Sequence, residues 1–259
     1  MTSLLFEASA GRELLPGVRH ATVRSRALGH RADLSTVLVP GTVPAAMVIL
    51  LHGVYGSHWS WLHQGGADLA LSQLTAAGVI PPMLLVMPSD GGWGDGSAYA
   101  NFGGADHESW IVDEVPDVVS AMHELHGPLP LFIGGLSMGG FGALRLAARH
   151  PSTFTAVAAH SSVASLEGLQ QFGRAPLDDS IDDRDLATLL CETKGLPPLA
   201  LDCGVDDFLI DDNRCLHRAL TAGGVAHTYD ESGGGHEWPY WQRRLPIALQ
   251  FFADRLYSQ

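Results

Sequence analysis

The chain predicts an α/β fold with a mainly parallel sheet, and two observations support this prediction. Short apolar runs and segments of helical period alternate over most of the sequence, as strands and crossover helices do in such a fold. The 30 glycines suit the many tight turns that this alternation requires. A length of 259 residues, without a repeat, a linker or a low-complexity tract, predicts a single domain over residues 1–259.

The N-terminal part predicts an antiparallel entry to the sheet. Residues 20–27 and 33–39 partly alternate polar and apolar side chains, and a Gly-His turn joins them. The first fully buried strand is expected at residues 46–51, because a short continuous apolar run suits a strand that is covered on both faces.

The later elements follow in alternation. Further strands are expected at residues 83–87, 129–133, 154–159, 199–203 and 227–230. Helices are expected at residues 67–77, 110–125, 138–149, 211–222 and about 241–256, with Pro116 tolerated in a first turn. Residues 161–198 interrupt the pattern with a polar stretch and a weak helix near 185–191, so this segment is a candidate for a small cap.

Composition excludes several classes of partner. The net charge of −13 argues against binding to nucleic acid or to an anionic membrane surface. The longest clean apolar run, residues 45–51, is too short to span a membrane, and residues 1–17 lack the features of a secretory signal. The three cysteines, Cys191, Cys203 and Cys215, fit reduced thiols. We therefore expect a cytoplasmic protein, either a monomer or a homo-oligomer.

A serine motif follows the strand expected at residues 129–133. Residues 135–139, Gly-Leu-Ser-Met-Gly, fit the pattern G-x-S-x-G. A strand precedes the motif and a helix rich in Ala and Leu follows it, which is the setting of a nucleophile elbow. Ser137 would then lie at a helix N-terminus, where free N–H groups favour developing negative charge. The alternative is a glycine-rich turn in which Ser137 only caps the helix.

A nucleophilic serine needs a general base, and the base needs an acid that orients it. After a nucleophile elbow, the acid comes next along the chain and the histidine last. Asp206 and Asp207 both follow the strand expected at 199–203, and their spacing alone does not separate them. His236 follows the last expected strand, in a loop with three glycines, and is the best-placed of the 13 histidines.

The remaining histidines do not predict a metal site. They are scattered, without an H-x-H or H-E-x-x-H pattern, and we expect neither a metal nor a cofactor. His52, His107 and His160 fall near strand ends or in loops. We interpret them as polar lining of the cleft or as surface groups.

Acyl transfer also needs two N–H donors that face the tetrahedral oxygen. One candidate is the backbone N–H of Met138, which follows Ser137. The other is that of Val54, in the loop after the strand at 46–51, where Gly53 allows a close approach of the backbone. A simple glycine turn is the alternative for this loop.

Aromatic residues gather in the loops that are expected near the strand ends, and such residues either line a ligand pocket or anchor loops and core. They are Trp59, Trp61, Trp93, Tyr99, Phe102 and Trp238. Of these, we select Trp59 and Trp238 as candidate substrate contacts.

Together, these segments resemble the esterase family of the esterase D type, which includes tributyrin-type esterases, S-formylglutathione hydrolases and feruloyl esterase domains. The resemblance rests on residues 51–53, 134–140, 203–208 and 234–238 and extends from about residue 45 to the C-terminus. It implies an α/β-hydrolase fold without metal or cofactor. It also assigns the acid to Asp207, the second aspartate of Gly-Val-Asp-Asp-Phe, and the second oxyanion donor to Val54.

The hypothesis from sequence is a serine carboxylesterase that hydrolyses short-chain or aryl esters through an acyl-enzyme on Ser137. An acyltransferase or a thioester hydrolase of the S-formylglutathione type could use the same triad. A peptidase, a non-catalytic binding protein and a metallohydrolase are further alternatives. They are disfavoured by the lack of a large second domain, by the full residue set and by the scattered histidines, respectively.

Overall fold

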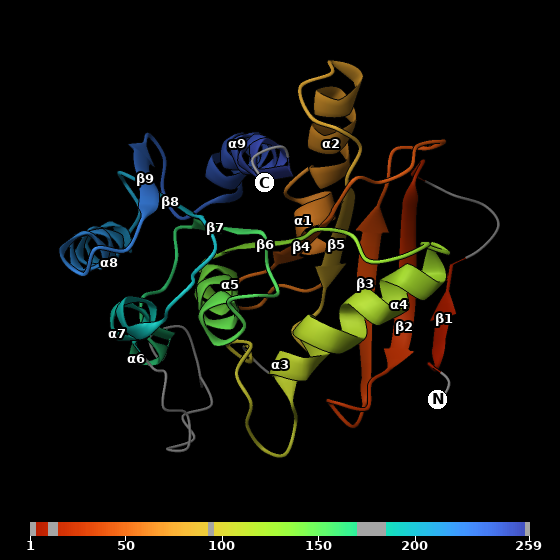
Figure 1. Ribbon diagram of the computed structural model, residues 1–259, viewed down its shortest axis with the longest axis horizontal. Helices are drawn as coiled ribbons and strands as arrows, with labels where there is room; N and C mark the ends of the chain where they lie inside the picture. The colour runs from red at the N-terminus through yellow and green to blue at the C-terminus, as the bar shows by residue number, and fades with distance from the viewer. Residues whose placement is uncertain (1–3, 10–14, 93–95, 170–184, 257–259) are drawn as a thin grey trace.

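One sheet unites strands from the N-terminal and C-terminal parts of the chain. The computed structural model describes residues 4–9, 15–92, 96–169 and 185–256. Its strands lie in the order β1-β2-β3-β5-β4-β6-β7-β8-β9 (Figure 1). Their bounds are β1 Phe6–Ala8, β2 Val18–Arg24, β3 Arg31–Val37, β4 Met47–Leu51, β5 Leu84–Pro88, β6 Leu131–Leu136, β7 Ala156–His160, β8 Leu199–Gly204 and β9 His227–Ser232. The pairings of β1 with β2, β2 with β3 and β3 with β5 are antiparallel, and the others are parallel, as the sequence predicts.

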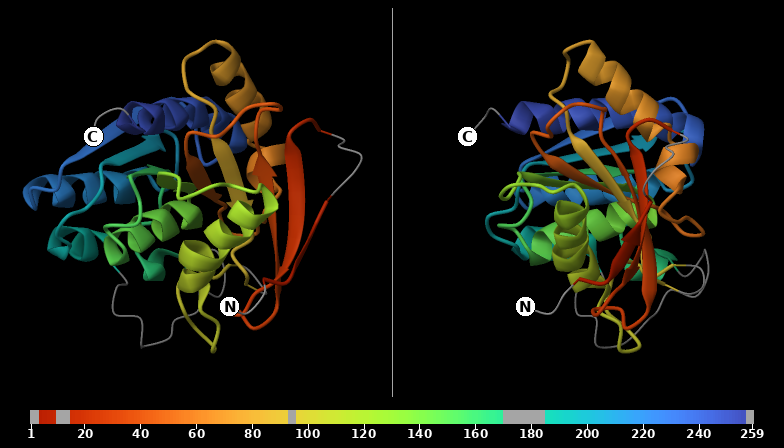
Figure 2. Two further views of the ribbon diagram at one scale, coloured as in Figure 1. Left: turned by 45° about the vertical axis from the view of Figure 1, so that its right-hand side comes forward. Right: turned by 90° about the vertical axis from the view of Figure 1, so that its right-hand side faces the viewer.

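Helices cover both faces of this sheet. They are α1 Ser60–His63, α2 Ala67–Ala76, α3 His107–Ser109, the π-helical turn η1 Trp110–Glu114, α4 Val115–Met122, α5 Met138–Arg149, α6 Leu166–Leu169, α7 Leu186–Glu192, α8 Ile210–Ala222 and α9 Trp238–Leu256. α2 and α9 lie on one face, and α4 and α5 lie on the other (Figure 2). The molecule therefore has two apolar cores, one on each side of the sheet.

Strand β4 shows why a continuous apolar run predicts a central strand. All five of its residues are buried. Met47, Ile49 and Leu51 pack into the core on the α5 side, and Val48 and Leu50 pack into the core on the α9 side. Successive side chains of a strand point to opposite faces, so a strand covered on both faces must be apolar at every position.

The chain order of the central strands creates a crevice at the carboxyl end of β4. Strand β5 pairs with one side of β4, and β6 pairs with the other. Ligands bind at such a switch point in open α/β sheets. Leu51 pairs with Gly135, so the loop after β4 and the turn after β6 begin side by side.

Several elements differ from their expected bounds. The helix expected at 110–125 begins as η1, and Pro116 lies in the first turn of α4, where its missing N–H is tolerated. Strand β6 extends to Leu136, because Gly134 and Gly135 continue the pairing with β7. Helix α9 begins at Trp238, earlier than expected. Strand β1 and the short helices α1, α3 and α6 are too brief to have left a periodic pattern.

The candidate cap is described only at its two ends. α6 and α7 contribute apolar side chains to the core on the α5 side, namely Leu166, Leu169, Leu186 and Leu190. These ends are therefore part of the main body. Residues 170–184 lie outside the described residues, so the cap stays a prediction.

Candidate active site

Ser137 lies at the turn between β6 and α5, in a strained backbone conformation. Its φ is 54° and its ψ is −119°, a region that residues with a Cβ rarely adopt. A Cβ on Gly135 would overlap the carbonyl of Gly139, and a Cβ on Gly139 would overlap the carbonyl of Leu51. The Ser137 N–H donates to the His160 carbonyl at 2.9 Å, which ties the turn to β7. This is the local structure that the G-x-S-x-G motif predicts.

Three side chains from three separate loops meet at this turn. The Nε2 atom of His236 lies 3.0 Å from Ser137 Oγ. On the other side of the ring, Nδ1 lies 2.9 Å from Oδ2 and 3.1 Å from Oδ1 of Asp207. With Nδ1 donating to the carboxylate, Nε2 is free to accept the serine proton. The geometry therefore joins a hydroxyl, a base and an acid in one chain of hydrogen bonds.

The structure separates the two adjacent aspartates. The Asp207 side chain is 0% exposed, whereas Asp206 is exposed to solvent. Burial by itself would raise the pKa of the Asp207 carboxyl. The hydrogen bond and ion pair with His236, together with the Leu209 N–H at 2.9 Å, outweigh it and hold the pKa below its usual value. Asp207 is thus an anion at neutral pH, directed at the imidazole.

Glycines bring the His236 loop back over the sheet. A Cβ on Gly204 would overlap the Gly234 carbonyl, which accepts a hydrogen bond from the Asp206 N–H at 3.0 Å. Gly234 itself has a φ of 133°, which favours glycine. The loops that carry the acid and the base are therefore packed directly against each other, which fixes the distance between their side chains.

The loop after β4 passes close to Ser137. A Cβ on Gly53 would lie 2.9 Å from Leu136 Cδ1 and 3.3 Å from Ser137 Cβ. A larger residue at this position would have to displace the Leu136 side chain, so glycine favours the close approach. Val54, the next residue, lines the same pocket as Ser137. Met138 begins α5 directly after Ser137, so its N–H lies at the free N-terminus of that helix. Val54 therefore lines the pocket that contains Ser137, and Met138 directly follows Ser137 in the chain.

A pocket of about 660 Å³ opens over Ser137 and His236. Trp59 and Trp238 both line it, as the selected substrate contacts should. Three further aromatic residues line it without having been selected, namely Tyr55, Phe208 and Trp241. Phe208 and Trp241 flank the His236 ring, with centroid distances of 4.6 Å and 5.0 Å. Phe208 directly follows Asp207, and Trp241 lies one helical turn after Glu237. Their closeness in the sequence to the predicted acid and base could have identified them as pocket residues.

The other aromatic candidates serve the scaffold. Trp61 is 1% exposed and donates its indole N–H to the Leu51 carbonyl. Tyr99 is 0% exposed and donates its hydroxyl to the His52 carbonyl, and Phe102 stacks on His107. Trp93 lies outside the described residues.

His52, His107 and His160 are buried, which corrects their interpretation as cleft lining or surface groups. Each is at most 2% exposed, and each is held by hydrogen bonds. His52 Nδ1 donates to the Gly53 carbonyl at 2.7 Å, and His160 Nδ1 pairs with Asp202 at 2.7 Å. The side chains of His52 and His107 thus bond to backbone carbonyls, and that of His160 bonds to a carboxylate.

The described residues hold no group of three His, Cys, Asp or Glu side chains arranged to bind a metal ion. None of the helices in the described ranges is long and apolar enough to cross a bilayer. Cys191, Cys203 and Cys215 are free thiols.

Comparisons with known proteins identify the family of the chain. The model of a family described as "Putative esterase" matches residues 25–252. An acetyl esterase from Caldicellulosiruptor saccharolyticus is 28% identical over 230 residues, which cover 79% of this chain and 82% of the relative.

Solved structures confirm the α/β-hydrolase fold. A ferulic acid esterase superposes with a TM-score of 0.80 at 25% identity, over 92% of this chain and 98% of its own. An S-formylglutathione hydrolase from Staphylococcus aureus superposes with a TM-score of 0.72 at 21% identity, over 97% of this chain and 100% of its own.

Proposed function

The chain belongs to the Putative esterase family and is a serine carboxylic ester hydrolase, and from this premise we propose which residues carry the reaction. Ser137 is the nucleophile, His236 is the general base and Asp207 orients the base. The observation that carries this assignment is the unbroken chain of hydrogen bonds from Asp207 through His236 to the Ser137 hydroxyl.

The first half-reaction forms an acyl-enzyme. His236 Nε2 accepts the proton of Ser137 as Oγ attacks the ester carbonyl carbon, and the Asp207 carboxylate stabilises the imidazolium. The backbone N–H groups of Val54 and Met138 donate to the negatively charged oxygen. The C–O bond to the alcohol then breaks, and His236 gives its proton to the leaving alcohol. In the second half-reaction, His236 Nε2 accepts a proton from water as the water oxygen attacks the acyl carbon. The bond to Ser137 Oγ then breaks, His236 returns the proton to Oγ, and the carboxylic acid leaves.

The pocket favours neutral esters with a short or aromatic acyl group. Its walls are largely apolar, and five aromatic side chains line it: Tyr55, Trp59, Phe208, Trp238 and Trp241. Aromatic walls suit a planar ring through edge and face contacts. The relatives named for acetyl and ferulic acid esters support the same two substrate classes.

The remaining assignments rest on the sequence. We propose that residues 1–259 form one domain, since a single sheet includes strands from the N-terminal and C-terminal parts of the described chain. A cytoplasmic location is also proposed, since the three cysteines are unpaired. A small-molecule ester is the proposed partner of the site.

A series of p-nitrophenyl esters, from acetate to decanoate, together with methyl ferulate, tests this function. Wild type should hydrolyse acetate or ferulate fastest, and Ser137→Ala should lower kcat/KM by about 10⁴-fold or more. Added alcohols would reveal acyl transfer as a second product. Near-full activity of Ser137→Ala would contradict the assignment of the nucleophile.

A further inference from the structure

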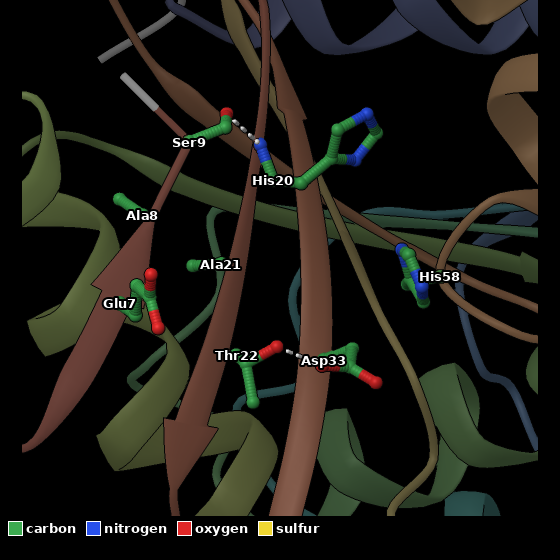
Figure 3. A pocket seen from close by; sticks show the side chains of 8 residues that line it. All are labelled: Glu7, Ala8, Ser9, His20, Ala21, Thr22, Asp33 and His58. Carbon is green, nitrogen blue, oxygen red and sulfur yellow. Dashed lines mark hydrogen bonds between the residues drawn. The ribbon is translucent and has the colours of Figure 1, made fainter.

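A second group of polar side chains lies on the sheet next to the loop after β4. Figure 3 shows the imidazole rings of His20, from β2, and His58, from the loop before α1, on the same side of these strands. Their ring centroids are 6.0 Å apart. Between them lies Ser35 of β3, which is 0% exposed. Its hydroxyl oxygen is 2.8 Å from Nδ1 of His20 and 2.8 Å from Nδ1 of His58.

The number of hydrogens on Ser35 limits which tautomers the two rings can adopt. The hydroxyl of Ser35 has one hydrogen, so it can donate to only one of the two rings. The other ring must carry a proton on Nδ1 and donate to the hydroxyl. With both rings neutral, the three groups form one directed chain of hydrogen bonds. If both Nδ1 atoms are protonated, the buried hydroxyl loses its acceptor, which costs free energy.

The surroundings favour the neutral rings. Burial is the main cause that lowers the pKa of both His20 and His58. His63 lowers the pKa of both rings further, and His20 and His52 also lower that of His58. Asp33 of β3 acts in the opposite direction on His58. Its carboxylate already accepts a hydrogen bond from the Thr22 hydroxyl at 2.6 Å (Figure 3).

The chain of hydrogen bonds is attached to the catalytic loop. His58 belongs to the same loop as Val54, the proposed oxyanion donor, and precedes Trp59, which lines the pocket. Within this loop the Gly56 N–H donates to the Gly53 carbonyl at 3.1 Å, and the Ser57 N–H donates to the Ser60 hydroxyl at 3.0 Å. Because these hydrogen bonds hold the loop together, a displacement of His58 would also displace Val54.

We propose that His58, Ser35 and His20 form a brace that positions the oxyanion loop for catalysis. The inference rests on the function proposed above, and none of the three residues contacts the reacting atoms. The brace connects the antiparallel extension of the sheet to the active site. The chain of hydrogen bonds is intact while one of the two rings accepts from the Ser35 hydroxyl. It breaks when that accepting ring takes up a proton on Nδ1.

Four variants test this proposal. Ser35→Ala and His58→Leu remove the brace. His58→Asn keeps a side-chain amide close to the position of Nδ1, and Thr22→Val is the matched control. Thr22→Val removes the hydrogen bond from Thr22 of β2 to Asp33 of β3. Neither residue belongs to the loop that contains Val54 and His58. Each variant is assayed for ester hydrolysis from pH 4.5 to 9, beside wild type and Ser137→Ala.

The brace predicts a specific pattern. Ser35→Ala and His58→Leu should lower kcat by about tenfold or more with little change in KM, because a displaced oxyanion donor weakens binding of the transition state. His58→Asn should recover most of kcat, and Thr22→Val should match wild type. In wild type, log(kcat/KM) should fall toward acid pH by up to about tenfold more than in Ser35→Ala, since opening the brace costs as much as removing it. In Ser35→Ala this additional fall should be absent, because the brace is already removed.

Two results overturn the proposal. The first is a kcat of Ser35→Ala or of His58→Leu within twofold of Thr22→Val. The second is an acid limb of Ser35→Ala that falls as far as that of wild type. If Ser35→Ala does not fold, His58→Leu decides the outcome. Activity that survives in Ser137→Ala would instead reject the proposed function, so the two failures are distinguishable.

Discussion

Adjacent carboxylates, Asp206 and Asp207, have opposite surroundings at the end of β8. The Asp207 N–H donates to the Gly204 carbonyl at 3.1 Å, and its carboxylate accepts from the Leu209 N–H. This turn directs Asp207 inward to His236, while Asp206 faces solvent. Although the two aspartates are adjacent in the chain, only Asp207 is buried next to His236.

The pair provides a matched test of the acid. Asp207→Asn keeps the size of the side chain but removes the charge and favours the wrong imidazole tautomer, so kcat/KM should fall by about 10⁴-fold. Asp206→Asn removes an equal charge one residue away and should stay within about twofold of wild type, as an exposed charge interacts weakly. Kinetics on one ester suffice, and equal losses in both variants would contradict the assignment.

Gly53 offers a test of the oxyanion loop. Gly53→Ala would place a Cβ 2.9 Å from Leu136 Cδ1 and 3.3 Å from Ser137 Cβ, so the Leu136 side chain, the turn at Ser137 or the loop itself must shift. We expect kcat to fall by about 10²-fold or more, the effect of losing one oxyanion donor. Gly233→Ala is the control, since a Cβ there meets no atom within 4 Å. A Gly53→Ala enzyme as fast as this control would remove the loop from the mechanism.

His123 predicts a loss of stability in mild acid. Its Nε2 lies 2.9 Å from the hydroxyl of the buried Thr36, and burial, together with the nearby Arg19, lowers its pKa to about 4. The unfolded chain takes up this proton near pH 6.5 and the folded chain only near pH 4. The free energy of unfolding therefore decreases as the pH falls between these values, by about 1–2 kcal/mol after allowance for solvent screening.

Thermal unfolding between pH 7 and 4 measures this effect. In His123→Gln the contribution of this group should vanish, so its melting temperature should decline less with acidification than that of wild type. If the melting temperatures of the two proteins fall equally with pH, His123 does not contribute to the loss of stability, which would contradict this prediction.

Sequence patterns predicted the positions of those site residues that a local turn determines. The contact between Ser137 and His236 was predictable, because a tight turn after a strand requires glycines at fixed positions; their catalytic roles stay a proposal. Asp207 was separable from Asp206 only through a resemblance, because spacing does not reveal the direction of a side chain. Phe208 and Trp241 were missed, since their contact with His236 depends on how the loops pack.

At the scale of elements, a buried ion cluster joins the segment before α4 to α5. Glu108 of α3 accepts hydrogen bonds from Arg145 at 3.1 Å and from Arg149 at 2.7 Å, and pairs with His150 at 2.6 Å. Burial opposes ionisation of Glu108, but the hydrogen bond with Arg149 and the charge of Arg145 hold its pKa below the usual value. The cluster therefore fixes α3 onto α5, the helix that follows Ser137.

Breaking this cluster should be costly. Glu108→Gln removes the buried negative charge that pairs with Arg145, which is 3% exposed, and with Arg149. We expect a loss of about 3–5 kcal/mol in the free energy of unfolding, or about 10 °C in Tm. Asp211→Asn is the control, because this carboxylate is 89% exposed and pairs only loosely with Arg214 at 3.5 Å. Calorimetry that finds equal Tm values for both variants would contradict the role of the cluster.

Elements of regular period were predicted best. Helix α5 has the expected bounds, Met138–Arg149, because its apolar pattern and the Pro151 that follows its end are both local signals. The π-helical start at Trp110 was not predicted, since Pro116 tells where a helix is interrupted but not how the preceding turn adjusts.

At the scale of the whole molecule, the order of strands determines the site. The sequence predicts an α/β alternation, but it does not state that β5 and β6 lie on opposite sides of β4. That order brings the loops after β4 and β6 together, and the parallel pairing of β8 with β9 brings Asp207 beside the His236 loop. The site is thus a property of the assembled sheet, whereas each of its residues belongs to a local turn.

Covalent labelling of the serine tests the central claim most directly. A fluorophosphonate reacts with an activated serine when Oγ attacks phosphorus and fluoride leaves, and intact-protein mass spectrometry then detects one adduct. We predict a single adduct that peptide mapping assigns to Ser137, slow labelling of His236→Ala and none of Ser137→Ala. An adduct on another serine, or equal labelling of Ser137→Ala, would contradict the assignment of Ser137 as the nucleophile of this esterase.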